Sequence, residues 1–317
     1  MVNASSVPGK LKETGFHVET FPFSHEMPSA ALYNQRVYLE KNDGNGLVRF
    51  IQTRGSDVLI QTYLYAGDGR AENARFSGFG GIEFLEEAAP FLDDFIKAVE
   101  SWCRGHGVQE IMFKLPPWPY FPRLPFLEDA LVQNGYSVRF NEINQHIQVS
   151  SAALAGRMQP DEKRRLRRCY EAGFQFRQLN ADDLPLAYEL IERNHRRRGF
   201  PVTMTLEGLG KMFRYFPGSY LLFGVFDGDR LVATAVSIRV NPRVLYNFYH
   251  GSHEDYQHLS PIVMVIEGVY RYCQKMQYNY LDIGISSVKG KWNEGLYRFK
   301  KNCGCEDADK KLFYKAL

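Results

Sequence analysis

The residues best suited to chemistry lie near the C-terminus of the 317-residue chain, in Arg298-Phe299-Lys300-Lys301. This run follows the apolar segment Tyr280-Leu281-Asp282-Ile283 and falls in a short predicted helix. A lysine ammonium group can interact with negative charge that develops on a substrate, so Lys300 is the first candidate for a site residue. The alternative is a solvated lysine, the usual fate of lysine on a short helix.

Tyr249 and His250 end another predicted strand and are further catalytic candidates. A histidine titrates near neutrality and can relay the proton of an attacking amine. The alternative is a structural pair at a strand end. Asp282 lies inside an apolar strand pattern, where a carboxylate needs partners, so structural support is its expected role. We see no Ser-His-Asp or Cys-His pattern, and amide formation from an activated ester needs no covalent nucleophile.

Two basic runs could bind phosphate groups. One includes Arg164 and Arg165, which we predict as substrate-binding residues, and the other spans residues 193–198. Clusters of arginine and lysine neutralise phosphates in nucleic acids and nucleotides. A charge run on a helix is more often a solvated face, so both interpretations stay open.

A glycine-rich stretch in the first half, Ser77-Gly78-Phe79-Gly80-Gly81, is the candidate cofactor loop. Without side chains at Gly78, Gly80 and Gly81, backbone N–H groups can approach a phosphate closely. A tight loop explains the same residues equally well, because a short glycine motif is weak support for a ligand site. Glutamates follow directly and would repel an anion.

Composition excludes several classes of protein. Hydrophobic residues make up 44% and charged residues 24%, as in globular proteins, and a net charge of +3 does not by itself indicate nucleic-acid binding. No apolar run reaches the roughly 20 residues that span a bilayer, and the N-terminus has no signal-type stretch, so we expect a cytoplasmic protein without a membrane span. The five cysteines are scattered, which predicts neither a disulfide framework nor a metal site.

The hydrophobic pattern predicts two similar series of elements. The first has a strand meander at 37–67 with turns at 43–46 and 54–57, a helix at 88–106, a strand at 108–115, a helix at 125–133 and a strand at 136–149. The second has a meander at 220–251, a helix at 262–276, a strand at 278–285, a helix at 295–302 and a strand at 311–317. Before its meander come a basic helix at 160–173, a strand at 173–178 and helices at 182–198 and 205–215.

This repeat predicts two domains, a truncated one over residues 1–150 and a complete one over 151–317. The order strand, two helices, meander, helix, strand, helix, strand is that of the acetyltransferase (GNAT) fold. We therefore predict an α+β sandwich class with tandem GNAT-like domains, each a mixed central sheet flanked by helices.

The segment from Tyr256 to Lys301 resembles the C-terminal part of the FemAB-type peptidyl and aminoacyl transferases. The resemblance is carried by LSP before a helix, YLDIGIS on a strand and GLYRFKKNCG after it, with KRRLRRCYEAGFQF upstream. It implies two GNAT-like domains with a site in the cleft between them. It further implies that the pair Phe299-Lys300 contacts an acyl donor and that Lys300 is a catalytic residue, which stabilises developing negative charge. We predict Arg298, Tyr256 and Ser260 as further substrate-binding residues.

One departure bears on the donor. GNAT enzymes hold the coenzyme A pyrophosphate in a glycine-containing loop before a helix, but residues 253–261 here lack glycine and carry two carboxylates. The resemblance thus implies an aminoacyl-tRNA donor more than an acyl-CoA, and no permanently bound cofactor. The predicted function is acyl or aminoacyl transfer to an amine of a small molecule, sugar or peptide. The alternative is a non-catalytic GNAT-fold module that binds a nucleotide-linked or RNA ligand. The sequence does not indicate the oligomeric state.

Overall fold

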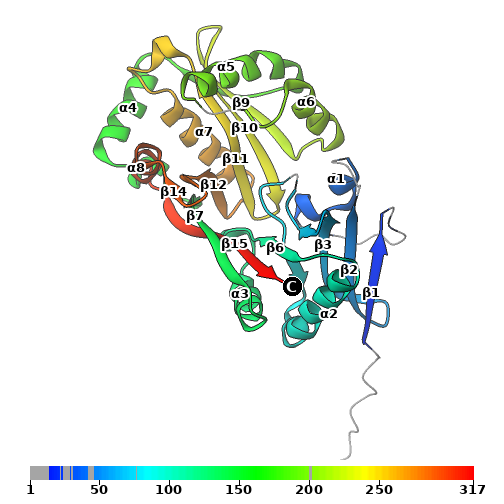
Figure 1. The fold of residues 1–317 in the computed structure, drawn as a ribbon. Helices are drawn as coiled ribbons and strands as arrows, with labels where there is room; N and C mark the ends of the chain where they lie inside the picture. The colour runs from blue at the N-terminus through cyan, green and yellow to red at the C-terminus, as the bar shows by residue number, and fades with distance from the viewer. Residues whose placement is uncertain are drawn as a thin grey trace, which may run out of the picture.

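The computed structural model describes residues 14–317 apart from 22, 24–28, 30, 42–45, 76 and 200–201. Over this part of the chain, a single 13-stranded sheet runs through both halves of the molecule (Figure 1). Its strands follow the order β1-β2-β3-β4-β6-β15-β7-β12-β11-β10-β9-β8, and β5 pairs with β3 at the side. The predicted α+β class with mixed sheets flanked by helices is confirmed.

The first half contains β1 (Thr14–Thr20), α1 (Arg36–Lys41), β2 (Leu47–Arg54), β3 (Asp57–Gly67), β4 (Arg70–Glu72), β5 (Ile82–Phe84), α2 (Leu92–Gly105), β6 (Glu110–Lys114), α3 (Leu124–Gln133) and β7 (Ser137–Gln148). Short 3-10 turns lie at Leu32–Asn34, Glu86–Phe91 and Trp118–Tyr120. The predicted turn at 54–57 is confirmed, with Gly55 at a φ of 64°. Most of the predicted turn at 43–46 lies outside the described residues.

The prediction of a strand from residue 37 is wrong, because Arg36–Lys41 is helical. Tyr38 and Leu39 are both buried, which neighbouring residues of a one-sided strand cannot be. The Tyr38 ring packs 5.2 Å from Tyr33 and 5.6 Å from Phe216, measured between ring centroids. The meander consists instead of β2, β3 and β4, and β1 adds an edge strand that the sequence pattern did not predict.

The second half follows the predicted order closely. It contains α4 (Pro160–Glu171), β8 (Gln175–Leu179), α5 (Leu184–Arg197), α6 (Leu206–Tyr215), β9 (Tyr220–Asp227), β10 (Arg230–Asn241), β11 (Val244–Ser252), α7 (Ile262–Lys275), β12 (Tyr280–Ile285), α8 (Glu294–Asn302) and β15 (Glu306–Ala316). A hairpin of β13 (Ser287–Val288) and β14 (Lys291–Trp292) precedes α8. The Thr205 side chain caps α6 by accepting from the Gly208 N–H at 3.1 Å.

The last strands of the two halves are exchanged. The C-terminal strand β15 lies between β6 and β7 and pairs antiparallel with both, while β7 of the first half pairs with β12 of the second. Figure 1 shows the red β15 running along the green β7 into the first half. This exchange of strands joins both halves in one continuous sheet. The predicted boundary at residue 150 falls just after β7 and stays a prediction.

The cores reflect this arrangement. One cluster fills the first half beneath α2 and α3, and a second lies between α4, α7 and the second-half strands. A third cluster joins the halves, since it combines Tyr33, Phe79 and Tyr120 with residues of α5, α6 and β9–β11. Within the described ranges, none of the helices is long and apolar enough to cross a bilayer.

Candidate functional site

A gap between β11 and β12 lies at the centre of the candidate site. These parallel strands pair only from Val244–Tyr246 to Tyr280–Asp282, although β11 continues to Ser252 and β12 to Ile285. A β-bulge on β11, opposite Val236 and Ser237, leaves Phe248 as an extra residue just beyond the last pair. Bulges bend strands and are frequent beside active sites. The gap leaves backbone groups of both strands open to a ligand.

Lys300 of α8 extends into this gap. Its side chain is 2% exposed, and Nζ donates to the carbonyl oxygens of Gly284 at 2.9 Å and Ile285 at 2.8 Å. Burial lowers the pKa of Lys300 to about 8, while Cys305 and Asp282 act in the opposite direction. The interpretation of a solvated lysine is therefore wrong. Two of the three ammonium hydrogens are engaged, which leaves one for a substrate.

Asp282 connects the two halves beneath the gap. Its Oδ2 accepts a hydrogen bond from the Tyr120 hydroxyl, and its Oδ1 accepts from Asn144 Nδ2 at 2.9 Å and the Gly284 N–H at 2.6 Å. The side chains of Asp282, Tyr120 and Asn144 are all buried. Gly284 adopts a φ of 79°, so the carboxylate fixes a turn that glycine favours. Because the Gly284 carbonyl binds Lys300, this network sets the position of the lysine.

His250 and Tyr249 lie on the open part of β11 but differ in their surroundings. His250 Nδ1 is buried without a hydrogen-bond partner among the described residues. Burial, and then the charge of Lys300, lower the pKa of His250 to about 3, so the imidazole is neutral at pH 7. The Tyr249 hydroxyl accepts from the N–H groups of Thr203 at 3.0 Å and Met204 at 3.1 Å, which ties β11 to the start of α6.

The other predicted substrate contacts lie on α8 and in the segment before α7. Phe299 is half-buried against the second-half core, and Arg298 is exposed and paired with Glu294 at 2.5 Å. The Tyr256 hydroxyl donates to Asp227 at 2.8 Å. Ser260 has a φ of 53° at the turn just before α7.

The basic helix α4 carries its charges in pairs. Arg164 lies 3.0 Å from Asp161, and Arg165 lies 2.7 Å from Glu162. The Arg164–Asp161 pair is exposed and solvated, whereas Glu162 is buried beside the half-exposed Arg165. Both arginines are neutralised within the helix. The structure does not bring these arginines to the gap through any recorded contact.

The glycine-rich loop packs against the end of β6. The Gly80 N–H donates to the Lys114 carbonyl at 3.0 Å, and a Cβ on Gly80 would lie 2.5 Å from the Asn73 backbone oxygen. The Gly81 carbonyl accepts from Thr62 at 2.9 Å, and Gly81 has a φ of 139°. Close packing therefore explains glycine at position 80, and the positive φ explains it at position 81. Gly78 is different, since a Cβ there would meet only Lys310 Nζ, at 3.7 Å.

A large cavity of about 960 Å³ opens between the halves beside this loop. Its walls include Tyr33, Phe79 and Tyr120 from the first half and Arg243 from the second. Glu83 also lines it, and burial raises the pKa of that carboxyl group. Tyr120 thus faces the cavity and at the same time reaches Asp282 beside the gap.

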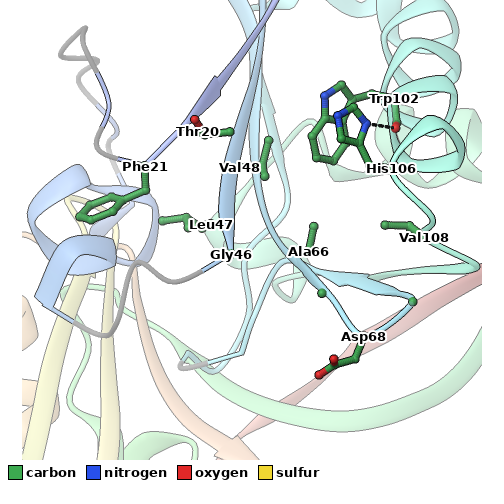
Figure 2. Close-up of a pocket in the computed structure, with 12 residues that line it drawn as sticks. Thr20, Phe21, Gly46, Leu47, Val48, Ala66, Asp68, Trp102, His106 and Val108 are labelled. Atoms are coloured by element: carbon green, nitrogen blue, oxygen red, sulfur yellow. Dashed lines mark hydrogen bonds between the residues drawn. The ribbon is translucent and has the colours of Figure 1, made fainter.

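A smaller hollow of about 370 Å³ lies entirely in the first half (Figure 2). Trp102 and His106 stack there with ring centroids 3.8 Å apart, and His106 Nδ1 lies 2.8 Å from the Trp102 carbonyl oxygen. Its lining includes none of the residues around Lys300 or Asp282. We therefore place the candidate site at the gap and the larger cavity.

Sequence reasoning missed Asn144 as a member of the site, and it missed the buried Lys310 on β15. It gave Tyr120 no role, because the rigid aromatic stretch 116–122 could equally wall a cleft or be a packed loop. Tyr120 lies in a proline-rich stretch whose place in the fold was not evident from its composition. Asn144 and Lys310 lie on the two exchanged strands. An isolated polar residue in a strand pattern is the available signal, but it does not identify the partner.

Comparisons with known proteins agree with this architecture. Residues 159–301 match the family described as an acetyltransferase (GNAT) domain. No curated protein sequence matches the chain. Among solved structures, the chain is similar to FemX, with a TM-score of 0.67 and 12% identity over 85% of this chain and 87% of that one. It is also similar to L-PGS from Bacillus licheniformis, with a TM-score of 0.57 and 12% identity over 82% of each chain. At such identities the structural likeness shows the fold alone.

Proposed function

Because the chain carries a GNAT-superfamily domain over residues 159–301, we propose that it is an N-acyltransferase that moves an acyl or aminoacyl group to an amine held between its halves. The carrying observation is the buried Lys300 at the gap between β11 and β12, with one ammonium hydrogen unengaged. A buried, fixed cation beside unpaired strand edges suits a reaction in which negative charge develops on a carbonyl oxygen.

The reaction needs few groups from the protein. The acceptor amine attacks the acyl carbon, a C–N bond forms, and the C–O or C–S bond to the donor breaks. Lys300 donates to the oxyanion in between, and the amine proton leaves with the donor oxygen or sulfur or passes to water. The neutral His250 accepts a hydrogen bond at its free Nδ1 and so orients the amine or the donor. The open edge of β11 binds an extended donor arm through backbone hydrogen bonds.

The acceptor binds in the 960 Å³ cavity. Aromatic walls at Tyr33, Phe79 and Tyr120 suit a sugar ring or an apolar side chain. The half-buried Glu83, which accepts from Ser29 at 2.6 Å and Gln61 at 2.8 Å, can bind an ammonium group of a peptide or small molecule. The acceptor cavity and the donor site at the gap then meet at Tyr120, which borders the cavity and contacts Asp282.

The donor is an aminoacyl-tRNA in preference to an acyl-CoA. The loop before α7 has no glycine and carries Glu254 and Asp255 in its 3-10 turn, so a pyrophosphate would meet negative charge there. An ester at the end of a tRNA needs no pyrophosphate loop at this helix. The hairpin of β13 and β14 that precedes α8 carries exposed lysines at 289 and 291, which suit the phosphates of a tRNA.

The test is a transfer assay with radiolabelled aminoacyl-tRNA and with acetyl-CoA, each against a panel of amines. We expect transfer from aminoacyl-tRNA and loss of transfer in Lys300→Met. Lys301→Met is the matched control, because Lys301 is a neighbouring lysine, 40% exposed, that pairs with Asp307. Donor binding without transfer in the wild type would support the binding-module alternative. Absence of both binding and transfer would refute the proposal.

A further inference from the structure

The exchanged strand β15 brings Lys310 and Lys114 together next to the glycine-rich loop. Lys310 of β15 is directly opposite Glu142 of β7, and Leu312 is opposite Lys114 of β6. Cross-strand partners share a face of the sheet, and so do residues two apart on a strand. Lys310 and Lys114 are therefore diagonal neighbours on one face, and the loop over them is anchored by the Gly80 bond to the Lys114 carbonyl.

Lys310 is 9% exposed, yet within the described part of the chain its Nζ has neither a hydrogen-bond acceptor nor a carboxylate within 4.0 Å. Its recorded neighbours are the Phe79 ring, 5.5 Å away, and the open space at Gly78. Glu142 does not serve as its partner. The carboxylate oxygens of Glu142 accept from the Ser287 hydroxyl and the Lys289 N–H, each at 2.5 Å. The negative charges of Asp282 and Glu142 act on the Lys310 ammonium group, but neither carboxylate lies within 4.0 Å of it. Burial of this ammonium group is therefore compensated only in part, and an anion in direct contact with it would complete the compensation.

The charges and the space around Lys310 favour a small anion. Burial and the nearby Lys114 charge lower the pKa of Lys310 to about 8, although Asp282 and Glu142 act in the opposite direction. Burial also lowers the pKa of Lys114, against the charges of Glu142 and Glu72. Both effects would be relieved by an anion lying between the two ammonium groups. Gly78 leaves room beside Nζ, and Phe79, whose ring lies 5.5 Å from Nζ, also lines the large cavity, so the two spaces adjoin.

We propose that Lys310, Lys114 and the Ser77–Phe79 loop form an oxyanion-binding subsite, which takes a carboxylate or phosphate group of a ligand whose remainder occupies the adjoining cavity. The subsite does not depend on Lys300 or on acyl transfer. It extends the proposed function because it selects ligands that carry an anionic group at a fixed distance from the cavity.

The experiment measures binding of inorganic phosphate and of acetate to the full-length protein by calorimetry and by thermal unfolding. We expect at least one anion to bind and to raise the Tm, with affinity reduced at least tenfold in Lys310→Met. Gly78→Ala, which places a methyl group 3.7 Å from Nζ, should weaken binding in the same direction.

Lys311→Met is the matched control, because Lys311 is the next residue of β15 and pairs with Glu128 at 2.6 Å. This variant should keep the wild-type affinity. Tighter binding of phosphate would identify a phosphoryl ligand, and tighter binding of acetate a carboxylate ligand. In addition, Lys310→Met without anion should unfold at a Tm no lower than the wild type, which excludes misfolding as the cause of lost binding. Equal affinity in Lys310→Met and wild type, or no binding of either anion to the wild type, would overturn the proposal.

Discussion

Replacing Lys300 by methionine separates a catalytic role from a structural one. The substitution keeps the length of the side chain and removes the ammonium group that binds the Gly284 and Ile285 carbonyls. Loss of one oxyanion donor lowers kcat by roughly 100- to 1,000-fold, or about 3–4 kcal/mol. We expect a loss of that size in the transfer assay.

The stability of the same variant should change little. Burial lowers the pKa of Lys300 from 10.5 to about 8, which corresponds to about 3 kcal/mol of destabilisation at neutral pH that methionine would remove. Two hydrogen bonds from a charged group, at roughly 1.5–3 kcal/mol each, are lost in exchange. The two effects nearly cancel, so urea unfolding at pH 7 should differ from wild type by no more than about 2 kcal/mol.

The pH dependence gives an independent check. Between pH 8 and 10.5 the unfolded chain still holds a proton that folded Lys300 has lost, so wild-type stability should rise with pH relative to Lys300→Met. If Lys300 acts as a proton donor to the oxyanion, the rate should fall above about pH 8. A rate that rises through this range would assign Lys300 as a base instead, and turnover within threefold of wild type in Lys300→Met would refute a catalytic role.

Three further outcomes follow from the structure. Asp282→Asn should lower the free energy of unfolding by roughly 2–4 kcal/mol in urea titrations and reduce kcat, because the new amide NH2 group would face the hydrogen-bond donors that now bind the carboxylate. Its effect should be less than additive with that of Tyr120→Phe. Folded His250 has a pKa near 3, whereas the unfolded chain binds a proton at this residue below pH 6.5, so the wild type loses stability as the pH falls. His250→Gln should reduce the loss of unfolding free energy between pH 7 and 4.5 by about 3 kcal/mol. Equal acid sensitivity of variant and wild type would contradict this. Gly80→Ala should lower the Tm because its methyl group meets the Asn73 backbone, whereas Gly156→Ala, with no atom within 4 Å, should not; similar Tm values for both variants would show that the loop can relax.

Local pattern was sufficient for most elements of the second half. Its helices and strands have one buried face each and clear turn residues at their ends, so periodicity identifies them. The first half was harder near residue 37, where an alternating pattern is helical because Tyr38 packs on Phe216 from the other half. That contact is long-range and leaves no trace in the local sequence.

The candidate site divides in the same way. The sequence placed Lys300 on a helix after a buried strand, and it identified Asp282 as a carboxylate that needs partners. It did not supply those partners, because Tyr120 and Asn144 belong to the first half.

By itself the sequence determined the two-fold repeat, the order of elements and the chemical groups available for transfer. Only the tertiary structure decided that β7 and β15 exchange places, and therefore that Asp282 joins the halves and Lys310 lies beside the glycine-rich loop. The physical reason is that strand pairing depends on backbone hydrogen bonds, which every residue type except proline can make. The choice of partner strand is thus set by the packing of the whole chain.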